Sequence, residues 1–174
     1  MSFQKVLVAL DRSVQALAVF EQALSEVKAK SNGSLILVHA LRMDAEIPTG
    51  TFVGLGTIAD LDTYGVLRQV QQEKIQREQD KSIAWLKSYQ QEAIAQGIST
   101  EITCLLGTPG TGICELAQSW GANLIVLGRR GHQGITEVVM GSVSNYVVHH
   151  APCSVLVVQG IMETVEAKPL GPVS

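Results

Sequence analysis

Residues 122–158 of the chain read ANLIVLGRRGHQGITEVVMGSVSNYVVHHAPCSVLVV. Within this stretch, Leu124–Leu127 is an unbroken apolar run of strand length, and Gly128 ends it. A second apolar run, Val155–Val158, closes the stretch. Because neither run alternates apolar with polar residues, both predict strands that are covered on two faces, as in a parallel sheet.

The segment between these two runs predicts a glycine-rich loop followed by a helix. Four of its side chains fall on one face at helical spacing: Val143, Tyr146, Val147 and His150. We expect this helix to begin near Gly141 or Ser142 and to stop before Pro152, which cannot continue it.

The loop and the helix start have the chemistry of a phosphate cradle. A helix start leaves several backbone N–H groups without partners and carries a partial positive charge, so it attracts anions. Glycines let an anion approach the backbone closely, and serine hydroxyls add donors. The residues of these kinds are Gly128, Gly131, Gly134, Gly141, Ser142 and Ser144, beside Arg129 and Arg130. Spacing alone leaves open a turn with a serine N-cap and no ligand, and two solvated arginines.

Four of these residues, Gly128, Gly131, Gly141 and Ser142, fit the pattern G-x2-G-x9-G-[ST]. In this pattern, and in its ending SVSNYVVHHAPCSVLVV, the chain resembles the ATP-binding branch of the universal stress protein family. The resemblance implies a Rossmann-like α/β fold. In that fold five parallel strands lie in the order 3-2-1-4-5, and helices cover both faces.

Composition indicates a globular protein with one domain. The chain has 174 residues, of which 46% are hydrophobic and 17% are charged, so we expect one domain over residues 1–160 and a tail over 161–174. A formal net charge of −3 argues against nucleic acid and anionic membranes as partners. No apolar run reaches bilayer-spanning length and the N-terminus enters a strand directly, so we expect a cytoplasmic protein. The three cysteines form no metal or redox pattern and are expected to be buried free thiols.

The rest of the chain alternates strands and helices. Residues 4–10 and 34–40 are apolar runs that predict strands, and Ser13 predicts the N-cap of the helix between them. The apolar residues of that helix are Val14, Leu17, Ala18, Phe20, Leu24 and Val27. This strand–helix–strand order predicts a parallel unit, and five strands with four helices predict a doubly wound parallel sheet.

Residues 41–66 break the alternation, because they are rich in glycine and show no periodicity. We expect a long excursion here that serves as a lid or a partner surface. A helix over 66–96 follows, with a polar first half that is solvated or projects beyond the sheet. Residues 98–106 predict a strand at a sheet edge, and 107–120 predict the helix after it.

In doubly wound sheets, a ligand binds beyond the carboxyl ends of the strands, where the winding reverses. The resemblance implies that the glycine loop and helix start hold phosphates and ribose, and that residues after the first two strands border adenine. The nucleotide-binding residues are then Ala9, Asp11, Ala40, Leu127, Gly128, Arg129, Arg130, Gly131, His132, Gly134, Gly141, Ser142, Val143 and Ser144. Asp11 would contact the nucleoside or Mg²⁺ on the phosphates, or would only form a turn. The two arginines favour a polyphosphate, and His39 is expected to be a buried strand residue.

The leading hypothesis is a stress or signalling protein that binds ATP or another adenine nucleotide and changes its protein partners accordingly. Homodimers are expected through the unprotected edge strand formed by Val155, Leu156, Val157 and Val158. A slow ATPase and a nucleotide-independent scaffold are the alternatives. No catalytic residue is assigned, because the sequence has neither a P-loop lysine motif nor a G-x-S-x-G motif.

Overall fold

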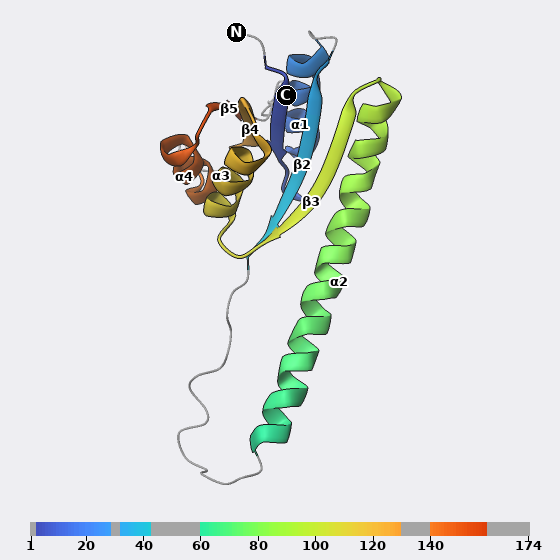
Figure 1. Ribbon diagram of the computed structural model, residues 1–174, viewed down its shortest axis with the longest axis vertical. Helices are drawn as coiled ribbons and strands as arrows, with labels where there is room; N and C mark the ends of the chain where they lie inside the picture. The colour runs from blue at the N-terminus through green and yellow to red at the C-terminus, as the bar shows by residue number, and fades with distance from the viewer. Residues whose placement is uncertain (1–2, 29–31, 43–59, 130–139, 160–174) are drawn as a thin grey trace, which may run out of the picture.

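The structure is a computed structural model that describes residues 3–28, 32–42, 60–129 and 140–159 (Figure 1). Strands and helices alternate along this part of the chain. In order they are β1 (Lys5–Ala9), α1 (Ala16–Lys28), β2 (Ser34–Leu41), α2 (Asp60–Ala95), β3 (Ser99–Leu106), α3 (Pro109–Trp120), β4 (Leu124–Gly128), α4 (Ser142–His150) and β5 (Ser154–Val158).

All five strands pair in parallel in the order β3-β2-β1-β4-β5, which confirms the predicted doubly wound sheet. The central strand β1 is fully buried at Val6, Leu7 and Val8. Its last residue, Ala9, pairs with β2 on one side and with β4 on the other. The carboxyl ends of β1 and β4 therefore lie next to each other where the winding direction reverses.

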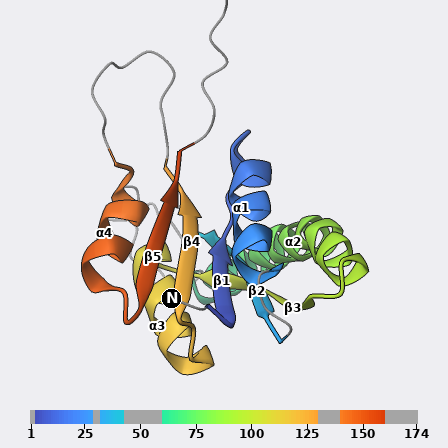
Figure 2. The ribbon, with the colours of Figure 1, turned by 90° about the horizontal axis from the view of Figure 1, so that it is seen from above.

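Helices cover both faces of the sheet (Figure 2). Val6 and Val8 pack with α1 and α2 in one apolar core, which includes the fully buried Phe20 and Leu86. Leu7 points to the opposite face and joins a second core built with α3 and α4. Successive residues of a strand point to opposite faces, so the unbroken apolar runs in the sequence fill both cores at once.

The start of α1 differs from the prediction. The helix begins at Ala16, and Ser13 lies in the preceding turn, where its hydroxyl accepts a bond from the Gln15 N–H at 3.3 Å. This bond is of the kind expected from a capping serine, but Ser13 lies three residues before the first residue of the helix. Val14 and Leu17, both expected on the apolar face, are 95% and 50% exposed. The buried face follows the i, i+3, i+4, i+7 spacing of a helix and carries Ala16, Val19, Phe20, Ala23, Leu24 and Val27.

Helix α2 begins at Asp60, six residues before the expected start, so the last residues of the excursion predicted near 41–66 are helical instead. Leu41 completes β2, and residues 43–59 lie outside the described part of the chain. A helix of 36 residues spans about 54 Å at 1.5 Å per residue. Its first half extends past the carboxyl ends of the strands (Figure 1), as the polar sequence predicted.

The remaining elements match their predictions closely. β3 is a sheet edge, and α3 has Pro109 in its first turn and ends at Gly121 in the left-handed conformation. The three cysteines are free thiols, although each is half-buried rather than fully buried. In the part of the chain that the structure describes, no helix has both the length and the hydrophobicity needed to cross a bilayer. The predicted tail over 161–174 lies outside the described residues.

Candidate functional site

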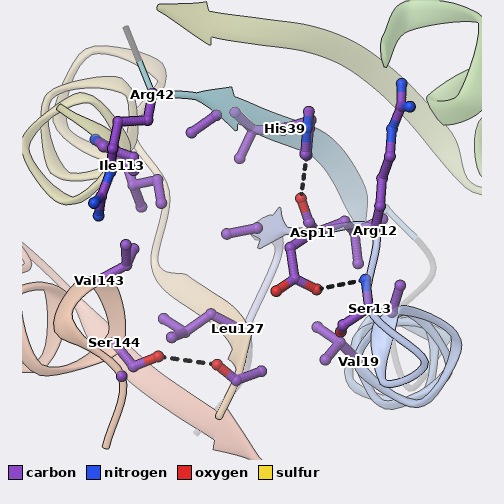
Figure 3. Close-up of a pocket in the computed structure, with 18 of the residues that line it drawn as sticks. Asp11, Arg12, Ser13, Val19, His39, Arg42, Ile113, Leu127, Val143 and Ser144 are labelled. Carbon is purple, nitrogen blue, oxygen red and sulfur yellow. Dashed lines mark hydrogen bonds between the residues drawn. The ribbon is translucent and has the colours of Figure 1, made fainter. Parts of the chain in front are cut away.

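A cavity of about 590 Å³ opens beyond the carboxyl ends of β1, β2 and β4, where the start of α4 faces the turn before α1 (Figure 3). Its volume falls within the usual range for sites that hold small ligands. Nine of the residues predicted to bind nucleotide line it: Ala9, Asp11, Ala40, Leu127, Gly128, Gly141, Ser142, Val143 and Ser144. Residues from three strands and one helix, far apart in sequence, thus meet at one place.

The other five predicted residues do not line the described cavity. Arg130, Gly131, His132 and Gly134 lie outside the described residues. Arg129 is described and half-buried, and its backbone N–H donates to the Val158 carbonyl at 3.0 Å. Its Nε is buried and has no hydrogen-bond partner among the described residues. Arg129 therefore lies beside β5, and its predicted contact with phosphate stays a prediction.

Asp11 forms one wall of the cavity. One of its carboxylate oxygens accepts a hydrogen bond from the Ser13 N–H at 3.1 Å, which is the turn interaction that the sequence allowed (Figure 3). The carboxylate lies at the carboxyl end of the central strand and lines the cavity at the same time. The turn and the predicted ligand contact are compatible, because a carboxylate has two oxygens and can accept several bonds.

The start of α4 forms the opposite wall. Gly141 is the N-cap residue, and no side chain caps the helix. The alternative of a serine N-cap is therefore wrong. The first intrahelical bond runs from the Asn145 N–H to the Gly141 carbonyl at 2.9 Å. The N–H groups of the first turn therefore lack partners within the helix. They belong to residues that line the cavity, where the positive end of the helix dipole favours an anion.

Ser144 lines the cavity and also makes a hydrogen bond within the protein. It is 4% exposed, and its hydroxyl donates to the Gly128 carbonyl at 2.9 Å. This bond ties the first turn of α4 to the end of β4 (Figure 3). Its hydroxyl proton is thus already used within the protein, whereas Ser142 is exposed at the start of the helix.

Packing alone explains one glycine of the motif. A Cβ atom on Gly128 would lie 3.0 Å from Cγ2 of Val19, a buried residue of α1. The first glycine of the pattern therefore lets α1 approach β4 closely, in addition to any role in ligand binding.

His39 is a buried residue of β2, as expected. Its Nδ1 is 2.8 Å from the Leu10 carbonyl, and its ring meets the Trp85 ring edge-on with centroids 5.4 Å apart. His39 lines the floor of the cavity and connects it to α2.

Sequence reasoning missed several charged residues that line the cavity: Arg12, Arg42 and Glu78. A hydrogen bond from Lys81 and the charge of Lys81 lower the pKa of Glu78, and Arg12 adds to this effect. Arg42 directly follows β2, so the carboxyl-end rule that identified Asp11 also applied to it. Glu78 gave no such signal, because it comes from the middle of a long polar helix. Among the described residues, no three His, Cys, Asp or Glu side chains cluster as a metal site.

Comparison with known proteins agrees with this architecture. The model of the universal stress protein family matches residues 2–159. Universal stress protein Sll1388 of Synechocystis is 37% identical over 161 residues, which cover 91% of this chain and 99% of that protein.

Solved structures share the fold. Universal stress protein UspA from Lactobacillus plantarum superposes with a TM-score of 0.69 at 24% identity, over 91% of this chain and 99% of that one. A universal stress protein in complex with cAMP gives a TM-score of 0.61 at 23% identity, over 91% and 98%. The Archaeoglobus fulgidus protein in complex with dAMP gives 0.55 at 22% identity, over 90% and 98%.

Proposed function

The chain belongs to the universal stress protein family, and from that premise we propose that it binds an adenine nucleotide in the cavity and signals the bound state to partner proteins. The observation that carries this proposal is the meeting of the uncapped α4 start and nine predicted residues around one cavity. Two structures of the same fold are complexes with cAMP and dAMP, both adenine nucleotides.

In this proposal the phosphates bind at the first turn of α4, where N–H groups without helical partners and the exposed Ser142 hydroxyl act as donors. The adenosine part extends toward Ala9 and Ala40, whose small side chains leave room at the ends of β1 and β2. Asp11 faces the nucleoside or Mg²⁺. The ion would arrive with the nucleotide, because a single carboxylate does not hold Mg²⁺ without phosphate ligands.

Homodimerisation through β5 is part of the same proposal. β5 is the last strand of the sheet and pairs with β4 on one side only among the described residues. Its residues Val155–Val158 are half-buried and apolar. The backbone N–H and C=O groups at such an edge gain hydrogen-bond partners when a second copy of the chain pairs with it. Since Arg129, next to the cavity residue Gly128, bonds to Val158, the edge and the cavity are adjacent.

Calorimetric titration with Mg-ATP, AMP and cAMP tests the binding site. Ala40→Phe places a large ring in the cavity, so we expect it to abolish nucleotide binding while leaving the circular dichroism spectrum unchanged. Ala84→Phe is the matched control, because Ala84 is exposed on α2 and does not line this cavity.

Thermal unfolding supplies a second measurement. At a hundredfold excess of ligand over its Kd, binding adds about 2.7 kcal/mol of stability, or about 5–10 °C in Tm. The wild type and Ala84→Phe should show this shift and Ala40→Phe should not. The absence of heat and of a thermal shift with all three nucleotides in the wild type would refute the proposal. Equal affinity in Ala40→Phe would place the site elsewhere.

A further inference from the structure

Two arginines line the cavity on different sides. Arg12 lies over the Trp85 ring, 5.9 Å from its centroid, and so faces α2. Arg42 follows β2, and its side chain runs past Ile113 toward Val143, on the side where α4 begins (Figure 3). The first turn of α4 and the Arg42 guanidinium therefore border the same part of the cavity.

Arg42 has no evident structural task. It is exposed, and within the described part of the chain it makes no ion pair and no hydrogen bond. The negatively charged lining residues, Asp11 and Glu78, come from the turn before α1 and from α2. A cation on the other side of the cavity is thus available to an anionic group of the ligand.

We propose that Arg42 binds the phosphates beyond the first and makes the cavity prefer a nucleoside polyphosphate over a monophosphate. This inference rests on the proposed nucleotide site and names its ligand class. The first turn of α4 offers a few N–H groups, enough for one phosphate. Each additional phosphate brings additional negative charge, and a guanidinium can bind two phosphate oxygens with two parallel hydrogen bonds.

From the sequence, the preference for a polyphosphate was predicted to come from the loop arginines, Arg129 and Arg130. Of these, Arg129 does not line the described cavity, and its backbone is tied to β5. Arg42 directly follows β2, whose last residue, Leu41, pairs with Leu106 of β3, so the backbone just before Arg42 is held by the sheet. A cation fixed at its base and exposed at its tip can follow a phosphate chain of variable length.

The affinities of Mg-ATP and AMP for Arg42→Gln, Arg42→Lys and Arg68→Gln test this role. Arg68→Gln is the matched control, because it removes the same charge from an exposed position on α2 that does not line the cavity. We expect Arg42→Gln to weaken Mg-ATP about tenfold, equivalent to about 1.4 kcal/mol, and to leave AMP within about twofold. Arg42→Lys should retain part of the ATP affinity, and Arg68→Gln all of it.

The salt dependence gives an independent readout. Because Arg42 is exposed, its attraction for phosphates is screened by ions, and the ratio of ATP to AMP affinity should fall between low and high salt in the wild type. The ratio should depend less on salt in Arg42→Gln.

Three results would overturn the inference while leaving the proposed nucleotide site in place. Equal weakening of ATP and AMP would show that Arg42 contacts the shared part of the ligand, for example by stacking on adenine. Unchanged affinity for both would show that it contacts neither. A wild type that binds AMP and ATP equally would also exclude the preference while leaving the nucleotide site intact. A wild type that binds no nucleotide would instead refute the proposed function, and this inference with it.

Discussion

Replacing Gly110 with alanine tests how the start of α4 is held in place. Gly110 is the second residue of α3, where α3 packs against α4. A Cβ atom at this position would lie 2.7, 2.9 and 3.0 Å from Cδ1, Cγ and Cβ of Tyr146. Carbon atoms in good contact are about 3.5–4.0 Å apart, so one of the two helices has to move. Tyr146 cannot yield easily, because its ring stacks on His150 with centroids 4.0 Å apart.

The cost follows from two opposing terms. Forcing an extra carbon into a well-packed contact costs about 1–3 kcal/mol. Alanine is favoured over glycine in a helix by about 0.5–1 kcal/mol, which offsets part of that cost. We therefore expect Gly110→Ala to lower the free energy of unfolding by about 1–2 kcal/mol, which corresponds to about 2–8 °C in Tm for a domain of this size.

Thermal and urea unfolding measure this change, and the same helix supplies a control. A Cβ on Gly112 would lie 3.3 Å from Cδ1 of Leu105, the far end of a flexible side chain. Gly112→Ala should therefore be neutral or stabilising by up to about 1 kcal/mol. In a double-mutant cycle, Tyr146→Ala should remove most of the penalty of Gly110→Ala. If Gly110→Ala were as stable as Gly112→Ala, the close packing of α3 on α4 would not be as described.

Two further predictions concern β5 and the cysteines. The Val158 carbonyl faces β4 through its bond from Arg129, so the backbone N–H of Val157 points to the open edge. Val157→Pro should therefore give monomers in sedimentation velocity, and a surviving dimer would place the interface elsewhere. Burial raises the pKa of Cys104, Cys114 and Cys153, so at pH 8 a smaller fraction of each is thiolate than in an exposed cysteine, whose ordinary pKa is about 8.5. Each should react with a disulfide reagent at pH 8 more slowly than a cysteine peptide does, and should approach the rate of the peptide only at higher pH; equal rates at pH 8 would contradict this.

The sheet was predictable because its strands lie in the interior. Runs such as 124–127 have to fill two apolar cores, and this requirement leaves an unbroken hydrophobic signal. The strand order came from the family resemblance, not from periodicity. Pairing between parallel strands is nonlocal and leaves no local pattern in the sequence.

Helix boundaries were harder to predict for a physical reason. Nearly all of the described side chains over 65–77 in α2 are exposed, and the polar sequence of this half gives no apolar stripe that would mark the start at Asp60. In α1, Val14 lies in the turn before the helix, and Leu17 lies at the margin of a buried face that Ala16, Val19, Phe20 and Ala23 define by their helical spacing. The start of a helix is the least certain part of a prediction from periodicity, because helix ends leave the weakest signal in the sequence.

The cavity walls at Asp11 and at Gly141–Val143 followed from the motif and the carboxyl-end rule, whereas Glu78 did not. Glu78 reaches the cavity only because α2 runs past the carboxyl edge of the sheet, which depends on tertiary packing of the helix (Figure 1). The carboxyl-end rule that identified Asp11 could also have identified Arg42, since Arg42 directly follows β2.

The motif residues divide into those that build the site and those that face its interior. Gly128 lets α1 pack closely against β4, and the Ser144 hydroxyl bonds α4 to β4, so both residues contribute to packing even without a ligand. Ser142 is exposed in the first turn and lines the cavity without such a bond among the described residues. A substitution at Gly128 or Ser144 therefore changes stability and affinity together. Only positions such as Ser142 and Arg42 can change affinity alone, so these positions distinguish a nucleotide site from a packing arrangement that merely resembles one.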